Sequence, residues 1–225
     1  MSICSDIQEI IENNLDEILS LRNTKQLKED NSFVSRGDLF CEKLVKDYLG
    51  TLPEDIYLIS EEKNNDDFNF EVYSKVVVMD PIDGTENFVS GLKEWGIGIS
   101  VYENKKHIES MIGLPELGLF IKTGDEFPKF ESRIYGISSS LSKEDLLNLE
   151  EGFEYRIIGC SMYNMYNVIT GSFAMFQNPK GANTWDILPG LNLALENNCQ
   201  IEVENKKYNG EFLYPNKKYR FKIKH

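Results

Sequence analysis

A run of β-branched residues that ends at two closely spaced acids constrains this chain more than any other feature. Residues 75–80 read KVVVMD, which is typical of a buried strand that delivers a carboxylate at its end. Pro81 stops strand pairing and Asp83 follows after one more residue, so both acids and the Ile82 carbonyl can face one small volume. Two carboxylates this close repel each other unless a cation lies between them. Taken alone, the pattern is also typical of a tight turn in which Asp83 caps a helix.

Two further acidic segments also follow or begin predicted elements. Glu61 and Glu62 come directly after a predicted strand at 56–60, and Asp186 stands at the start of a predicted helix at 185–198. By themselves, such residues are more often a solvated surface pair and a helix cap beside a core tryptophan. Because three acidic segments lie at the ends of separate elements, their joint occurrence favours one shared site.

The overall charge limits the partners that such a chain can have. Lys and Arg number 24 and Asp and Glu number 37, which gives a net charge of −13. This field does not attract nucleic acid or an anionic membrane, so an anionic substrate would need a local cation. The two histidines and four scattered cysteines form no zinc-type pattern. A bound cation would therefore have oxygen ligands, as Mg²⁺, Mn²⁺ and Ca²⁺ prefer.

The start of the chain and its apolar pattern predict a cytoplasmic protein. Residues 1–14 lack the basic and apolar segments of a secretory signal, and no apolar run is long enough to cross a bilayer. The four cysteines are interpreted as reduced thiols, in keeping with a reducing compartment.

Hydrophobic periodicity predicts a mixed α/β architecture. Helices are expected at 3–21, 39–49, 161–170 and 185–198, strands at 56–60 and 75–80, and an antiparallel meander over 95–124. We expect residues 1–130 to combine helices with an antiparallel sheet that carries most of the candidate ligands. Residues 131–225 would form a smaller α/β half that carries Asp186.

Several motifs resemble the inositol monophosphatase superfamily, which also includes fructose-1,6-bisphosphatase and 3′-phosphoadenosine 5′-phosphate phosphatase. DPIDGTENF at 80–88 is similar to the central motif of that family, and ISEE at 59–62 resembles its Gly-Glu-Glu element. The other resemblances are FVSRGD at 33–38, the segment 157–176, and TWDILPG at 184–190. The resemblance implies a layered αβαβα sandwich of this family's type, in a shortened form because the chain is short for the family.

The resemblance also implies a role for each matching residue. Metal ligands would be Glu61, Asp80, the carbonyl of Ile82, Asp83 and Asp186. The catalytic residues would be Asp38 and Thr85, which take a proton from the attacking water, and Glu61, which positions that water. Substrate would contact Gly84, Thr85, Gly159, Cys160 and Ser161.

The implied activity is that of a Mg²⁺-dependent, lithium-sensitive phosphomonoesterase. It would hydrolyse a small polyol or sugar phosphate by direct attack of metal-activated water, with two or three Mg²⁺ ions that Mn²⁺ can replace. Family members are often homodimers, which is expected here too. Alternatives are 3′-phosphoadenosine 5′-phosphate or fructose 1,6-bisphosphate as substrate, and a non-catalytic metal- or phosphate-binding protein of the same fold. The segment before Trp185 lacks the acid that inositol phosphatases have there, and Pro179, Lys180 and Asn183 occupy that neighbourhood. Lys180 could contact a second anionic substrate group, although such a residue is more often a solvated loop lysine.

Overall fold

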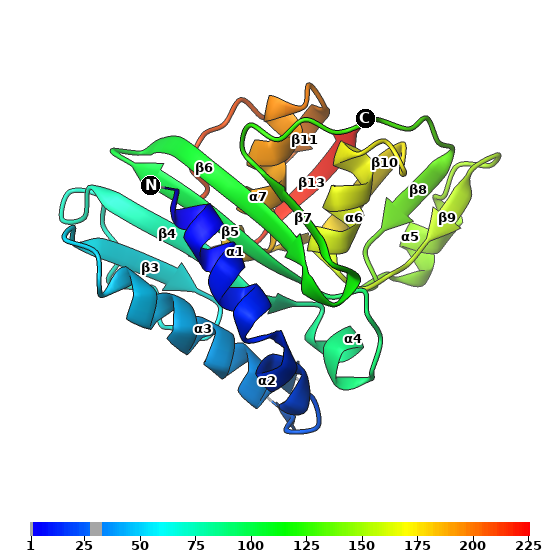
Figure 1. Ribbon diagram of the computed structural model, residues 1–225. Helices are drawn as coiled ribbons and strands as arrows, with labels where there is room; N and C mark the ends of the chain where they lie inside the picture. The colour runs from blue at the N-terminus through cyan, green and yellow to red at the C-terminus, as the bar shows by residue number, and fades with distance from the viewer. Residues whose placement is uncertain (1, 28–32) are drawn as a thin grey trace.

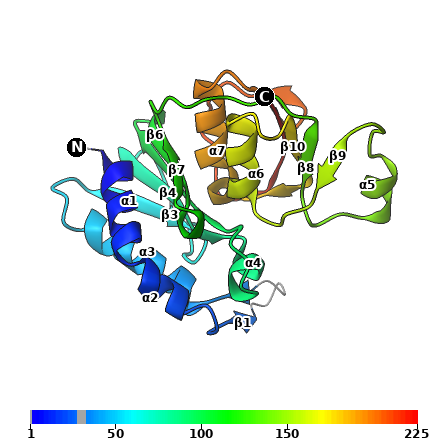
Figure 2. The ribbon, with the colours of Figure 1, turned by 45° about the vertical axis from the view of Figure 1, so that its right-hand side comes forward.

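The computed structural model describes residues 2–27 and 33–225, which form two β-sheets separated and flanked by helices (Figure 1). The described α-helices are α1 (Ile3–Asn13), α2 (Leu15–Ser20), α3 (Arg36–Leu49), α4 (Thr85–Val89), α5 (Lys143–Leu147), α6 (Ser161–Ile169) and α7 (Thr184–Glu196). Helices α1 to α3 cover one face of the first sheet, whereas α6 and α7 lie between the two sheets (Figure 2).

The first sheet has five strands in sequential order. They are β3 (Ile56–Ser60), β4 (Lys75–Asp83), β5 (Gly96–Glu103), β6 (Lys106–Leu114) and β7 (Leu119–Lys122), with a 3₁₀ turn η1 (Pro115–Leu117) before β7. Strand β3 runs parallel to β4, and the other neighbours are antiparallel. The antiparallel sheet expected for the first half is therefore a mixed sheet. The long connection over residues 61–74 returns the chain to the same end of the sheet, which a parallel pair requires.

The second sheet has six strands, which come from the chain after residue 130. Their spatial order is β12 (Lys206–Lys207), β11 (Gln200–Val203), β13 (Tyr219–Lys224), β10 (Met175–Ala182), β8 (Ile134–Ile137) and β9 (Glu154–Arg156). A separate two-stranded ladder joins β1 (Gln26–Leu27) to β2 (Phe33–Val34). Because α6 and α7 pack against both large sheets, the division of the chain at residue 130 into two domains stays a prediction.

The outermost helical layer is short in the described part of the chain. Helix α5 lies beside β9 at the far end of the molecule (Figure 2). In the same segment, the ring of Phe153 stacks on Tyr135 of β8 with 3.9 Å between ring centroids. The structure thus has the predicted mixed α/β class and layered arrangement, in a shortened form.

Strand β4 is buried on both faces, which explains why its sequence is continuously apolar. Val77 and Met79 pack with the core beneath α1 and α3, whereas Val76 and Val78 pack with the core around α6 and α7. Side chains alternate along a strand, so Asp80 follows Val76 and Val78 on the face that α7 covers. The core packing of β4 therefore points this acid toward the start of α7.

Two helices differ from their expected bounds because of capping side chains. The helix expected at 3–21 is interrupted at Asn14, whose side-chain amide donates to the Ile10 carbonyl at 2.7 Å and ends α1. The helix expected at 39–49 begins at Arg36, because the Ser35 side chain accepts hydrogen bonds from the first-turn N–H groups. Among the described residues, no helix is both long and apolar enough to cross a lipid bilayer.

Close packing of α6 against α7 predicts that Gly190 cannot accept a side chain. A Cβ atom at Gly190 would lie 2.9 Å from the Cβ of Met165. We expect Gly190→Val to lower the free energy of unfolding by about 1–3 kcal/mol, measured by urea denaturation. Gly50→Val is the matched control, since Gly50 is exposed at the end of α3 with ordinary dihedral angles. Equal effects of the two substitutions would contradict the packing argument.

Candidate active site

Three carboxylates from three elements converge at one edge of the first sheet. Strands β3 and β4 are parallel, with Ser60 opposite Met79, so the residues that follow these two positions meet at the same edge. Ligand oxygens of Glu61, Asp80 and Asp186 all lie within 4.8 Å of one another. We call these three residues the acidic cluster.

Asp80 is the most deeply buried member of the acidic cluster. Its side chain is 1% exposed, and its Oδ1 atom is buried with no hydrogen-bond partner among the described residues. The Oγ atom of Ser60, at the end of neighbouring β3, is also buried and has no hydrogen-bond partner in the described part of the chain. An unpaired buried carboxylate oxygen is unfavourable, and a cation would satisfy it.

The electrostatics of the site favour the binding of a cation. Burial raises the pKa of Asp80 well above its usual range, and the neighbouring Glu61 raises it further. The same two causes raise the pKa of Asp186 to about 8. The donor set consists of hard carboxylate oxygens, so the residues present fit Mg²⁺ or a similar divalent cation.

Asp186 owes its orientation to the start of α7. It is the third residue of the helix, and its Oδ2 accepts a hydrogen bond from the Asn183 backbone N–H at 2.7 Å. The Asn183 side chain completes a capping box at the same helix end. The cap thus holds one carboxylate oxygen.

Asp38 is held in the same way at the start of α3. Its Oδ2 accepts hydrogen bonds from the backbone N–H and the hydroxyl of Ser35, at 2.7 and 2.6 Å. Its Oδ1 accepts from the Thr85 hydroxyl at 3.2 Å, and that hydroxyl also lies 3.0 Å from the Ile82 carbonyl oxygen. The structure therefore brings together the residues predicted as a proton-accepting pair, while their catalytic role stays a prediction.

Asp83 lies beside the acidic cluster but bonds to a different element. Its Oδ2 accepts hydrogen bonds from the backbone N–H of Met162 and from the Cys160 thiol, the latter at 3.1 Å. Burial raises the pKa of Asp83 to about 6, and the hydrogen bonds from Met162 and Cys160 oppose that rise. The expected ligand is thus tied to the start of α6, and the Ile82 carbonyl lies near the Thr85 hydroxyl.

The residues predicted to contact substrate lie around the starts of α4 and α6. Gly84 has a positive φ of 81°, and a Cβ there would lie 2.9 Å from the Cβ of Cys160. The Asn87 side-chain amide donates to the Ile158 carbonyl at 2.8 Å, which ties α4 to the segment before Gly159. Gly84, Thr85, Gly159, Cys160 and Ser161 therefore border one region, although their substrate contacts stay predictions.

Lys180 has a partner within the protein. Its Nζ atom lies 2.7 Å from Oδ2 of Asp145 in α5, so its charge is already paired. Sequence reasoning did not anticipate this pair, nor the contact of Cys160 with Asp83. It also missed that Ser35 and Asn183 anchor Asp38 and Asp186, although Ser35-x-x-Asp38 and Asn183-x-x-Asp186 have the spacing of a capping box.

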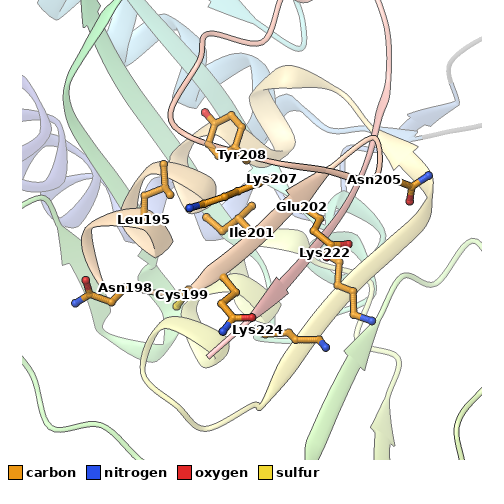
Figure 3. Close-up of a pocket in the computed structure, with 11 residues that line it drawn as sticks. Leu195, Asn198, Cys199, Ile201, Glu202, Asn205, Lys207, Tyr208, Lys222 and Lys224 are labelled. Atoms are coloured by element: carbon orange, nitrogen blue, oxygen red, sulfur yellow. The ribbon is translucent and has the colours of Figure 1, made fainter.

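A separate cavity of about 570 Å³ lies between the end of α7 and strands β11 to β13 (Figure 3). Lys207, Lys222 and Lys224 line it together with polar side chains. None of its lining residues belongs to the acidic cluster or to the other predicted site residues. The chemistry of the site, rather than the size of a cavity, therefore identifies the acidic cluster.

Comparison with known proteins gives a family and a fold. Residues 1–221 match the model of the inositol monophosphatase family. The curated 3′(2′),5′-bisphosphate nucleotidase CysQ of Haemophilus influenzae is 28% identical over 112 residues, which cover 48% of this chain and 41% of that protein. The CysQ of Escherichia coli K12 is 28% identical over 101 residues, or 44% of this chain and 40% of that protein. The matched segment therefore spans about two fifths of these relatives.

Solved structures show the same fold over nearly the whole chain. A crystal structure of an IMPase/NADP phosphatase complexed with Mg²⁺ and phosphate aligns with a TM-score of 0.81 at 21% identity, covering 99% of this chain and 88% of that one. A staphylococcal inositol monophosphatase-1 soaked in LiCl aligns with a TM-score of 0.80 at 22% identity and the same coverage.

The raised pKa values predict that the metal-free protein loses stability as the pH rises. Folded-state pKa values of about 6 for Asp83 and about 8 for Asp186 exceed the ordinary unfolded value of about 3.9. Between those limits the folded state holds more protons than the unfolded state, so the free energy of unfolding falls with pH, by up to about 1.4 kcal/mol per pH unit for each group.

This dependence can be measured by thermal unfolding of metal-free protein from about pH 5 to about pH 8. The melting temperature should fall across this range, and added Mg²⁺ should raise it more at the alkaline end. Asp186→Asn should flatten the fall, because the substitution removes a carboxyl group whose folded-state pKa is about 8. An unchanged slope in that variant would contradict the assignment.

Proposed function

The chain belongs to the inositol monophosphatase family, and from this premise we propose that it is a Mg²⁺-dependent phosphomonoesterase acting on a small polyol or sugar phosphate. The observation that carries the proposal is the acidic cluster, with its buried and unpartnered Asp80 oxygen, beside the hydrogen-bonded Asp38 and Thr85. A chain that needed these acids only for folding would gain nothing from bringing like charges together.

The acidic cluster would hold the cation through Glu61, Asp80 and Asp186, with Asp83 beside them. When bound, Mg²⁺ neutralises phosphate oxygens, lowers the pKa of water and stabilises the leaving alkoxide. The cation would offset the repulsion between an acidic protein and an anionic substrate. Phosphoryl transfer itself depends on positioning and charge stabilisation. Two or three ions would act, and Mn²⁺ would replace Mg²⁺ on the same oxygen ligands.

Asp38 and Thr85 would remove the proton from the attacking water. The Thr85 hydroxyl lies 3.2 Å from Asp38 Oδ1, so a proton received at the hydroxyl can pass to that carboxylate oxygen. Burial raises the pKa of Asp38, which makes its carboxylate a stronger base than an exposed aspartate. The Ser35 hydrogen bonds oppose that rise and keep the carboxylate in one orientation.

The phosphate would be bound without a basic side chain. Backbone N–H groups of Gly84 and Thr85 would bind its oxygens, and Gly159, Cys160 and Ser161 would border the leaving group. The positive φ of Gly84 lets the backbone turn into the start of α4, where N–H groups lack helical partners. The family resemblance also underlies our proposals of lithium sensitivity, a homodimer and a cytoplasmic location.

A second candidate substrate is a nucleoside 3′,5′-bisphosphate such as 3′-phosphoadenosine 5′-phosphate. Its specific support is the similarity to the CysQ proteins of Haemophilus influenzae and Escherichia coli, which are named as 3′(2′),5′-bisphosphate nucleotidases. The pairing of Lys180 with Asp145 does not favour this candidate, because a lysine already paired at 2.7 Å is less available to a second phosphate.

Replacing the buried acid tests the reaction class. We expect Asp80→Asn to lower Mg²⁺-dependent phosphate release by on the order of 10²–10³-fold, because the cation loses a charged ligand. The metal-free variant should remain folded and be no less stable than the parent protein, since the substitution removes a buried charge. Asp55→Asn, at an exposed acid away from the acidic cluster, is the control. Full activity of Asp80→Asn would refute the proposed reaction.

A substrate panel separates the candidate substrates. Phosphate release is measured with and without Mg²⁺ and with added Li⁺, on inositol 1-phosphate, several sugar phosphates, fructose 1,6-bisphosphate and 3′-phosphoadenosine 5′-phosphate. We expect Mg²⁺-dependent, lithium-suppressed release, with the highest kcat/KM on a polyol or sugar monophosphate. A higher value on the nucleotide would favour the second candidate. Phosphate binding without any release would favour the non-catalytic alternative.

A further inference from the structure

Cys160 joins the start of α6 to a candidate metal ligand. Its Sγ atom lies 3.1 Å from Oδ2 of Asp83, and the backbone N–H of Tyr163 donates to the same sulfur at 3.3 Å. The residue is 2% exposed, so neither contact competes freely with water. Cys160 is also the N-cap residue of α6, a position that Ser, Thr, Asp and Asn usually occupy.

The direction of the two hydrogen bonds is fixed by chemistry. The Tyr163 N–H can only donate, so the sulfur accepts from it. An ionised Asp83 can only accept, so the single thiol proton points to its Oδ2. The Met162 N–H donates to the same oxygen, which leaves Asp83 oriented by α6 and its cap.

The strand that carries Asp83 is irregular close to this residue, although Asp83 itself pairs with Gly96 of β5. The pairing of β4 with β5 shifts register between Asp80 and Asp83, so the regular ladder is broken just before this residue. In addition, Gly84 approaches Cys160 so closely that a Cβ there would lie 2.9 Å from the Cβ of Cys160. This packing keeps the thiol against Asp83.

We infer that Cys160 is a positioning residue, whose thiol holds the Asp83 carboxylate in the orientation that binds a divalent cation. The inference rests on the proposed function, because it requires Asp83 to be a metal ligand. Partners that orient ligating side chains usually contribute about 10- to 100-fold to metal affinity. We place Cys160 at the lower end of this range, because a thiol is a weak donor.

The test measures Mn²⁺ binding to the full metal-free chain by electron paramagnetic resonance, without substrate. We expect Cys160→Ala to weaken Mn²⁺ binding about tenfold, and Cys160→Ser to retain most of the affinity because a hydroxyl both donates and caps. Cys199→Ala is the matched control, since Cys199 is a buried thiol outside the acidic cluster and its neighbours. In turnover, Cys160→Ala should raise the Mg²⁺ concentration for half-maximal rate more than it lowers kcat.

The outcomes separate this inference from the proposed function. Parent protein that binds no Mn²⁺ would overturn both. Normal Mn²⁺ binding by a folded Cys160→Ala variant would overturn the positioning role alone. If that variant does not fold, infrared spectroscopy of the parent protein and Cys160→Ser identifies the S–H stretching band of Cys160. The frequency of that band should shift when Mg²⁺ is added, and an unchanged frequency would overturn the inference.

Discussion

The mutual repulsion of clustered carboxylates is the constraint on which the rest of this structure depends. Ligand oxygens of Glu61, Asp80 and Asp186 lie within 4.8 Å of one another, and the burial of Asp80 limits the screening of its charge by water. Core packing must therefore hold these charges in place in the metal-free state. The apolar faces of β4, which pack under α1 and α3 on one side and under α6 and α7 on the other, provide that support. A divalent cation would turn the same cluster from a source of instability into a stabilising contact.

The fold orients these acids by binding one carboxylate oxygen at a helix N-terminus, which leaves the other oxygen for a different partner. In Asp38, Oδ2 is held by the cap at the start of α3 while Oδ1 meets Thr85. In Asp186, Oδ2 is held by Asn183 at the start of α7. Asp83 is also held at a helix N-terminus, but that helix is α6, which is distant in sequence, and its Met162 N–H donates to Oδ2. Helix N-termini favour this arrangement, since their free N–H groups and dipoles stabilise negative charge.

Much of this arrangement could be predicted from local pattern, and the parts that could not depend on long-range contacts. The β-branched run before Asp80 predicted a buried strand, and the helices expected at 161–170 and 185–198 correspond to α6 and α7. The expected helix over residues 3–21 was wrong at Asn14, where one side chain ends α1. The expected antiparallel sheet was wrong at β3, because hydrophobic pattern does not give strand direction. The sequence suggested a possible substrate contact for Lys180, but it did not show that Lys180 forms an ion pair with Asp145, which is distant in sequence.

The sequence by itself determined which residues carry charge, where strands and helices end, and that these ends bear acids. Those properties follow from local chemistry: β-branched residues favour strands, proline and glycine end them, and polar side chains cap helices. Only the tertiary structure decided which acids meet. The parallel pairing of β3 with β4 brings Glu61 to Asp80, α7 adds Asp186, and α6 takes Asp83 through Met162 and Cys160. Contacts between residues so far apart along the chain depend on the packing of whole elements, which local sequence pattern does not specify.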